Sequence, residues 1–394
     1  MAAFAAVMTG SGAGAIATIL LCGESVQAVL SEIFLSSGQG SPAFEPGRIR
    51  LGHIVDGADV IDQVTVGCEG PDVFAIHCHG NPLITERIMS LLRSRGVDLL
   101  AAESALARTL STERPDDSIA IEAKLALTKV KTIEGARIIV AQIEGGLAQT
   151  VRRWSREKDS ISLAEIAGQA RQILRDSQTA RLIVDGCTVA LVGPPNTGKS
   201  TLLNTLAGCE KAIVTDIEGT TRDWISAEIL IPPLAATVID TAGLGADAVA
   251  ADGDGIDQAA QARSVEILRR ADLVLLVLDL SRPDPHMGEK LLEALADKRV
   301  LTVLNKSDLP SRLDLAALPA DTDKSVRISA KQAVGIDDLV RAIHRTLGVA
   351  SFDPHSPVAF TARQRTLLGR LAVTGMVSDA AAIVADILRG PIQD

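Results

Sequence analysis

The sequence predicts a multidomain α/β protein, with an α+β N-terminal domain, a helical region, an α/β domain and a second helical region. Three observations predict this class. Residues 1–98 alternate short apolar strand-like runs with amphipathic helices. Residues 99–182 and 350–394 carry apolar residues at helical spacing. Residues 183–349 alternate apolar runs with helices, which is typical of a parallel sheet.

The composition is typical of a globular protein and argues against DNA binding, a disulfide framework and a membrane span. The chain has 394 residues, of which 47% are hydrophobic and 2% aromatic, so its two or three domains need aliphatic cores. A formal net charge of −10 offers no global basic field for DNA. Five scattered cysteines show neither a metal spacing nor a disulfide framework, which favours a reduced, cytoplasmic protein. No apolar run predicts a membrane span.

A phosphate-binding loop lies near the start of the inserted domain. Residues 193–200 read Gly-x-x-x-x-Gly-Lys-Ser, between an apolar run at 187–192 and a helical run at 201–206. Such a P-loop points backbone N–H groups and a helix N-terminus at phosphate oxygens. We expect Lys199 to reach the outer phosphates and Ser200 to ligate Mg²⁺.

The motifs that follow indicate a guanine nucleotide. Asp240-Thr241-Ala242-Gly243 ends an apolar run, which places a carboxylate near Mg²⁺ and an amide near the γ-phosphate. Asn305-Lys306-Ser307-Asp308 ends another. The Asp308 carboxylate would accept hydrogen bonds from the guanine N1–H and amine, which adenine does not offer. Ser329-Ala330-Lys331 would supply a backbone N–H to the guanine carbonyl, and Thr220-Thr221 would supply a second hydroxyl to Mg²⁺.

The predicted site therefore draws on the P-loop, Thr220-Thr221, the end of the strand at residue 240 and two guanine motifs. The residues expected to bind GTP or GDP are Gly193, Asn196, Thr197, Gly198, Lys199, Ser200, Thr201, Thr220, Thr221, Asp240, Thr241, Ala242, Gly243, Asn305, Lys306, Asp308, Ser329, Ala330 and Lys331. Ser200 and Thr221 are the expected Mg²⁺ ligands.

These motifs, with the segments 76–80 (Ile-His-Cys-His-Gly), 142–147 (Gln-Ile-Glu-Gly-Gly-Leu) and 212–223, resemble the tRNA-modification GTPases of the MnmE, or TrmE, family. The order of parts matches over nearly the whole chain. The resemblance implies a Ras-like, TrmE-type P-loop G domain inserted in an all-α helical domain, after an α+β N-terminal domain. It implies a homodimer formed through the N-terminal domain. It also implies that GTP hydrolysis serves modification of the tRNA wobble uridine together with an FAD-binding, MnmG-type partner.

The resemblance further implies K⁺-stimulated hydrolysis and a catalytic acid. The resemblance adds Thr215, Asp216, Ile217, Glu218 and Gly219 to the expected nucleotide site, and the implied K⁺ shell comprises Asn196, Thr215, Ile217 and Thr220. The family's catalytic acid is a Glu that orients the attacking water, and two residues correspond to it here. Counting from Leu244 gives Asp252, whereas counting back from Arg263 gives Asp257. Either carboxylate is one methylene shorter than Glu, which predicts slow hydrolysis.

Departures from the family leave a second function open. The segment 390–394 stands where the family has Cys-x-Gly-Lys, and the family's folate-pocket Arg and Glu fall at 19–21 and 71–75, which supply neither residue. These changes argue against folate binding and wobble-uridine modification. The alternative is a nucleotide-gated switch or binding module that keeps GTPase activity. A ribosome-assembly GTPase would share the G motifs but not the segment 77–80.

Overall fold

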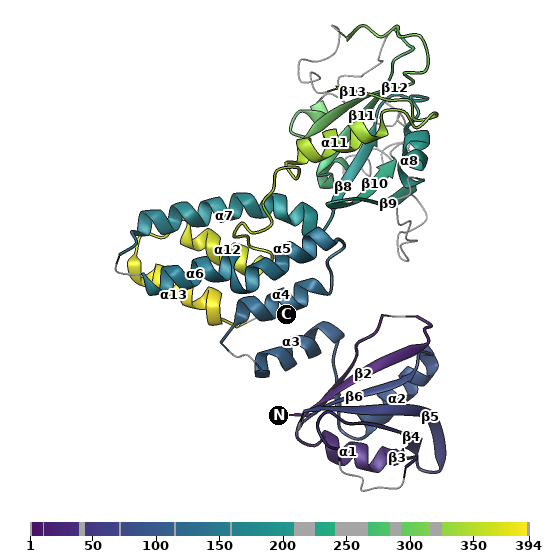
Figure 1. Cartoon of the computed structure of the whole chain (residues 1–394), viewed down its shortest axis with the longest axis vertical. Coiled ribbons are helices and arrows are strands. Elements are labelled where there is room, and N and C mark those ends of the chain that lie inside the picture. The colour runs from purple at the N-terminus through teal and green to yellow at the C-terminus, as the bar shows by residue number, and fades with distance from the viewer. Residues whose placement is uncertain are drawn as a thin grey trace, which may run out of the picture. The chain divides into compact units, whose positions relative to one another are not determined.

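The computed structural model describes residues 2–10, 12–38, 44–70, 72–113, 116–157, 160–208, 225–240, 267–283, 293–315 and 325–391. Contacts divide the chain into two units, Met1–Leu125 with Arg389–Asp394, and Ala126–Leu388. Each unit contains one β-sheet (Figure 1).

The first unit is built on a seven-stranded sheet in the order β3-β4-β5-β6-β2-β1-β7. Its strands are β1 (Phe4–Val7), β2 (Ile16–Cys22), β3 (Phe34–Ser36), β4 (Ile49–Asp56), β5 (Asp59–Gly70), β6 (Val73–His79) and β7 (Asp98–Leu99). Neighbouring strands are antiparallel except for β1 and β7. Fully buried Ile19, Phe74 and Ile76 belong to the main core of this unit.

Two helices contribute to that core, and two more follow the sheet in the chain. Helix α1 (Val26–Ile33) and helix α2 (Pro82–Ser94) place their apolar residues in the core. Helix α2 begins at Pro82 because the Asn81 side chain accepts a hydrogen bond from the Leu83 N–H at 2.9 Å, and proline needs no partner at this position. Helices α3 (Ala102–Glu113) and α4 (Ser118–Leu127) come next.

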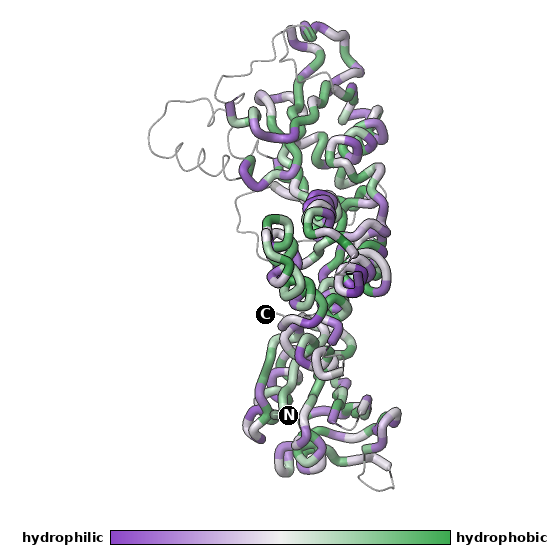
Figure 2. The backbone as a smooth tube through the Cα atoms, turned by 90° about the vertical axis from the view of Figure 1, so that its left-hand side faces the viewer, coloured by the Kyte–Doolittle hydropathy of each residue, from purple (hydrophilic) through white to green (hydrophobic). Residues whose placement is uncertain are grey.

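The helices of the second unit come from both sides of its sheet in the sequence. Helices α5 (Ile133–Glu144), α6 (Gly146–Arg156) and α7 (Leu163–Val184) precede the sheet in the chain, and α12 (Ala362–Leu371) and α13 (Val377–Arg389) follow it. Helix α7 begins with a capping box formed by Ser162 and Glu165. Helix α12 packs against α7, where Arg171 Nη1 donates to the Ala372 carbonyl at 2.9 Å. In Figure 2, hydrophilic and hydrophobic stretches alternate along the helical coils.

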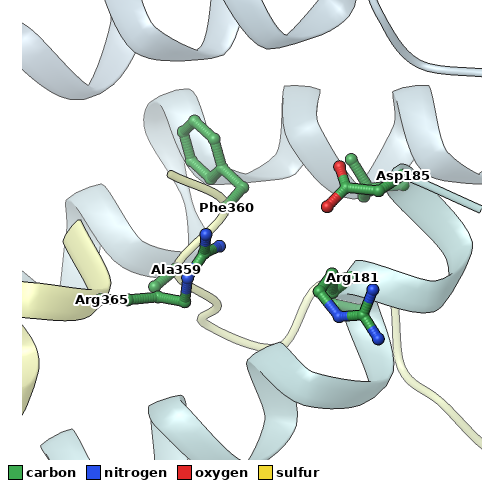
Figure 3. Close-up of a pocket in the computed structure, with 7 residues that line it drawn as sticks. Arg181, Asp185, Ala359, Phe360 and Arg365 are labelled. Carbon is green, nitrogen blue, oxygen red and sulfur yellow. The ribbon is translucent and has the colours of Figure 1, made fainter. Parts of the chain in front are cut away.

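Buried amides join the segment before α12 to the earlier helices. Gln142 is completely buried, and its Oε1 accepts from the backbone N–H groups of Leu147 at 2.9 Å and Val358 at 3.0 Å. The Ser177 hydroxyl of α7 accepts from the Ala359 N–H at 2.7 Å. Figure 3 shows the adjacent small cavity, which residues 180–185 and 359–365 line. This segment is therefore fixed by hydrogen bonds to groups distant in sequence.

The second sheet has the order β13-β12-β11-β8-β10-β9. Its strands are β8 (Cys187–Val192), β9 (Ile225–Ile231), β10 (Leu234–Asp240), β11 (Leu273–Asp279), β12 (Val300–Asn305) and β13 (Ser325–Arg327). All pairs are parallel except β9 with β10. Every residue of β11 is buried, as expected for a central parallel strand. Helices α8 (Lys199–Ala207) and α11 (Ile336–Leu347) follow β8 and β13 in the chain.

The apolar runs predicted at 187–192, before Asp240 and before Asn305 form β8, β10 and β12, whereas β1, β3, β7, β9, β11 and β13 were not individually predicted. Among the helices that the structure describes, none is long and apolar enough to cross a membrane.

Candidate functional site

The loop after β8 takes a shape that only glycine permits at two positions. Gly193 has φ 144°, and a Cβ there would lie 2.2 Å from the Val277 carbonyl oxygen. Gly198 has φ 93°, and its Cβ would lie 2.4 Å from Asn305 Nδ2. Both values of φ strain any residue with a side chain. The two glycines of the motif therefore let the loop fit closely against β11 and β12.

The side chains of Lys199 and Ser200 each have polar partners at this loop. Lys199 Nζ donates to the carbonyl oxygens of Gly193 and Pro194, both at 2.8 Å. Burial lowers the pKa of Lys199, and the charge of Asp240 opposes this shift. Ser200 Oγ donates to Asp240 Oδ2 at 2.5 Å. An ammonium group that uses loop carbonyls as acceptors is placed to exchange them for phosphate oxygens, and the hydroxyl–carboxylate pair suits Mg²⁺.

Asn305 connects the loop to the second guanine motif. Its Nδ2 donates to the Thr197 carbonyl at 2.8 Å, and its Oδ1 accepts from the Ala330 N–H at 2.9 Å. Asn305 lies at the C-terminal end of β12, next to the end of β11 in the sheet. One buried amide thus joins two segments that the sequence assigned separately to phosphate and to base.

Asp308 lies next to Ser329, whose hydroxyl donates to Asp308 Oδ1 at 2.6 Å. This hydrogen bond is the main reason that the pKa of Asp308 is lowered, and the charges of Lys331 and Lys306 act in the same direction. The carboxylate is exposed and stays ionised at neutral pH, as an acceptor for the two guanine donors must. The remaining predicted residue of this part, Thr201, lies exposed in the first turn of α8.

Sequence reasoning missed Asp279. It ends β11, and its Oδ2 accepts from Lys306 Nζ at 2.6 Å. Lys306 Nζ also donates to the Asn196 carbonyl at 2.7 Å. The available signal was a carboxylate that directly follows an apolar run, because ligand sites of parallel sheets gather at the carboxyl ends of strands.

Twelve of the 26 predicted site residues have no described position. The predictions for Thr215, Asp216, Ile217, Glu218, Gly219, Thr220, Thr221, Thr241, Ala242, Gly243, Asp252 and Asp257 lie outside the described residues. The described part of the site therefore contains the P-loop, Asp240 and the guanine motifs.

A second pocket lies in the first unit. Its volume is about 660 Å³, and its described lining comes from residues 7–10, 12–17 and 80–89. Glu86 is the one charged side chain among the described residues that line it. Ile19, Leu21 and Phe74 are fully buried core residues of the two segments that supply neither the Arg nor the Glu expected of a folate pocket. The described lining therefore offers no cation to an anionic ligand.

The histidine-rich segment beside this pocket is held by hydrogen bonds. His77 Nδ1 lies 3.0 Å from the Thr18 hydroxyl, and His79 Nδ1 lies 2.7 Å from Asp62 Oδ1. Burial raises the pKa of the Cys78 thiol between them. In the part of the chain that the structure describes, no group of three His, Cys, Asp or Glu side chains is arranged to hold a metal.

Comparison with known proteins identifies the relatives. Family models described as "GTP-binding protein TrmE N-terminus" and "50S ribosome-binding GTPase" match residues 3–105 and 188–306. The "tRNA modification GTPase MnmE" of Clostridioides difficile is 30% identical over 393 residues, covering 91% of this chain and 84% of that protein. The protein of the same name from Levilactobacillus brevis is 32% identical over 378 residues, covering 86% and 79%.

Among solved structures, the G domain of the T. maritima FeoB iron transporter matches 41% of this chain and 98% of that chain, with 27% identity and a TM-score of 0.30. The curated relatives extend over both units, and the N-terminal model covers most of the first sheet. The chain belongs to the MnmE family of tRNA modification GTPases.

Proposed function

We propose that this chain binds GTP and hydrolyses it to GDP and phosphate. The observation that carries the proposal is the position of Asp308. Its ionised carboxylate is oriented by Ser329, and Asn305 ties that motif to the phosphate loop. A carboxylate accepts from the N1–H and amine of guanine, whereas adenine presents no such pair of donors.

In this proposal the phosphates lie in the loop of residues 193–200. Lys199 would leave the two loop carbonyls and contact the outer phosphates. Ser200 and Asp240 fit Mg²⁺, because both are hard oxygen groups already within 2.5 Å of each other. The ion would supply neutralisation of charge on the phosphate oxygens. Thr221 is proposed as the second hydroxyl, and Asp252 or Asp257 as the acid that orients water.

K⁺ is proposed as a second cation beside the phosphates. Asn196 is exposed in the loop with φ 62°, and its carbonyl is held by Lys306. This conformation leaves the side chain as the group available to an ion. Thr215, Ile217 and Thr220 complete the proposed shell. A monovalent cation there would stabilise charge that develops during hydrolysis.

The experiment is phosphate release by the full chain in Mg²⁺ and K⁺, with GTP or ATP as the substrate. We expect release from GTP alone, and GTP to compete with a fluorescent GDP analogue where ATP does not. Binding of ATP as tight as that of GTP would overturn the proposal.

The wider role proposed is modification of the tRNA wobble uridine with an FAD-binding, MnmG-type partner, by a homodimer formed through the N-terminal domain. It is supported by relatives named tRNA modification GTPase that cover more than four fifths of this chain. We also propose that the helices before and after the G domain form one domain, because α12 packs against α7. The proposed boundaries are residues 1–98, 99–182, 183–349 and 350–394.

A second candidate is a nucleotide-gated switch that keeps GTPase activity without tRNA modification. The lining of the N-terminal pocket favours it, because a glutamyl-folate is anionic and Glu86 would repel it. Mass spectrometry of tRNA nucleosides, in a strain that lacks its own MnmE and expresses this chain, separates the two. Restored modified uridine supports the wider role, whereas active GTPase without it supports the switch.

A further inference from the structure

Asp279 is a nearly fully buried carboxylate whose two oxygens have separate partners. Its side chain is 3% exposed. Oδ1 accepts from the Ser281 N–H at 2.9 Å and the Ser281 hydroxyl at 2.6 Å. Oδ2 accepts from Lys306 Nζ at 2.6 Å. Ser281 therefore fixes the orientation of the carboxylate, so that its second oxygen faces Lys306.

Lys306 links the oriented carboxylate of Asp279 to the phosphate loop. The residue has φ 64°, its side chain is 30% exposed, and its Nζ donates at 2.7 Å to the carbonyl of Asn196. A free lysine ammonium is strongly hydrated on a flexible stem, with several rotamers available. The buried Asp279 carboxylate holds the Lys306 side chain in the rotamer that reaches the phosphate loop. Burial alone would raise the pKa of Asp279, but the hydrogen bonds from Lys306 and Ser281 outweigh it and lower that pKa, so the pair stays ionic.

The hydrogen bond from Lys306 to Asn196 joins two parts of the nucleotide site. The Asn196 carbonyl belongs to the loop that would surround the phosphates, and Lys306 belongs to the motif that would bind the base. Their hydrogen bond closes the loop against that motif. Arg282 Nε is 3.7 Å from Asp279 Oδ2, beyond hydrogen-bond distance, so it does not replace Lys306 as a donor.

We propose that Asp279 is a positioning residue that lengthens the residence time of guanine nucleotide, by holding Lys306 on the carbonyl of Asn196. The proposal rests on the proposed function, because it needs guanine nucleotide in this site. It assigns Asp279 no contact with the nucleotide.

The test is the rate at which the full chain releases a fluorescent GDP analogue into excess GDP, measured by stopped flow in Mg²⁺. Asp279→Asn keeps the shape of the side chain. Ser281 donates to the remaining oxygen, so the new amide N–H₂ faces the ammonium and the two donors repel each other. Losing one hydrogen bond between charged groups predicts release roughly 10- to 100-fold faster.

Asp272→Asn is the matched control. Asp272 precedes β11 at its other end, where it accepts from the Thr188 N–H at 2.9 Å and pairs with Arg181. Both variants remove a negative charge and an ion pair from the G domain, and both are expected to lower its melting temperature. Only Asp279→Asn is expected to speed release by more than about twofold.

A double-mutant cycle with Lys306→Met tests the route. If Asp279 acts through Lys306, then Asp279→Asn adds no further acceleration in the Lys306→Met background. Additive effects of the two substitutions would overturn the proposal, as would unchanged release in Asp279→Asn or equal acceleration in Asp272→Asn.

Two further results distinguish a failure of the proposed function, or of folding, from a failure of the role of Asp279. A wild-type chain that binds no GDP contradicts the proposed function and not the role of Asp279 within it. If Asp279→Asn does not fold, Ser281→Ala serves instead, because it keeps the charge and removes one hydrogen bond that orients it. We then expect release roughly three- to tenfold faster, and an unchanged rate rejects the proposal.

Discussion

Substitution of Asp308 by Asn is expected to convert guanine preference into xanthine preference. Ser329 Oγ donates to Asp308 Oδ1 at 2.6 Å. In Asp308→Asn the Ser329 hydroxyl can donate only to the amide oxygen. The amide oxygen therefore takes the position of Oδ1, and the amide N–H₂ takes the position of Oδ2. A donor then faces the guanine amine, which is also a donor, whereas xanthine presents a carbonyl oxygen there.

The magnitude follows from the hydrogen bond that is lost. Each of the two bonds from guanine to the carboxylate contributes about 1.5–3 kcal/mol, because the acceptor is charged. Because the amide group replaces only Oδ2, one of these hydrogen bonds is lost, which costs about 1.5–3 kcal/mol and corresponds to GDP binding roughly 10- to 100-fold weaker. Xanthosine diphosphate loses the clash of donors and should bind the variant more tightly than GDP does.

The assay is competition of GDP and xanthosine diphosphate against a fluorescent guanine nucleotide for the wild type, and against a fluorescent xanthine nucleotide for the variant. Asp297→Asn is the control, since this exposed residue of the same domain carries the same charge. Guanine affinity retained in Asp308→Asn would refute the assignment of Asp308 to the base. Equal losses of affinity in both variants would instead indicate an effect of net charge.

Four further outcomes are expected. Lys199→Ala should weaken GTP binding tenfold or more in an equilibrium titration, because no other ammonium is buried in the loop as the structure describes it. Hydrolysis should be faster in K⁺ than in Na⁺ at equal ionic strength, and Asn196→Ala should abolish that difference. Gln142→Leu should lower the free energy of unfolding by about 2–6 kcal/mol in urea, because two buried backbone N–H groups lose their acceptor. Burial, with the charge of Asp272, raises the pKa of the Cys187 thiol to about 12, so a thiol reagent at pH 8 should leave it unmodified until the chain unfolds.

Much of the nucleotide site could be predicted because its motifs act locally. The motif Gly-x-x-x-x-Gly-Lys-Ser predicts a phosphate-binding loop by itself. The apolar runs before Asp240 and Asn305 predict buried strands. Their order in the chain then brings these residues to one edge of a parallel sheet. The guanine motif Asn305–Asp308 could be read for the same reason, since one strand end carries all of it.

Contacts between distant segments could not be read in this way. Asp279 matters because Lys306 comes from the neighbouring strand, and nothing in the sequence near Asp279 identifies that partner. Strand β1, with the sequence Phe-Ala-Ala-Val, is too short and too rich in alanine to stand out, and its pairing with β2 and β7 defines it. Buried Gln142 looks like an ordinary polar position on a helix until Val358 is brought beside it.

The hydrogen bond between Ser177 and Ala359 also has a consequence for synthesis of the chain. The two residues are 182 positions apart, and the whole nucleotide-binding sheet is encoded between them. Ribosomes add roughly 5–20 residues per second, so α7 waits on the order of ten to forty seconds before α12 can cover it. During that interval the surface of α7 that α12 contacts in the finished protein has no C-terminal helix against which to pack. The nascent chain therefore exposes an apolar helical surface while its G domain is made, and this interval is when a chaperone or a second nascent chain would meet it.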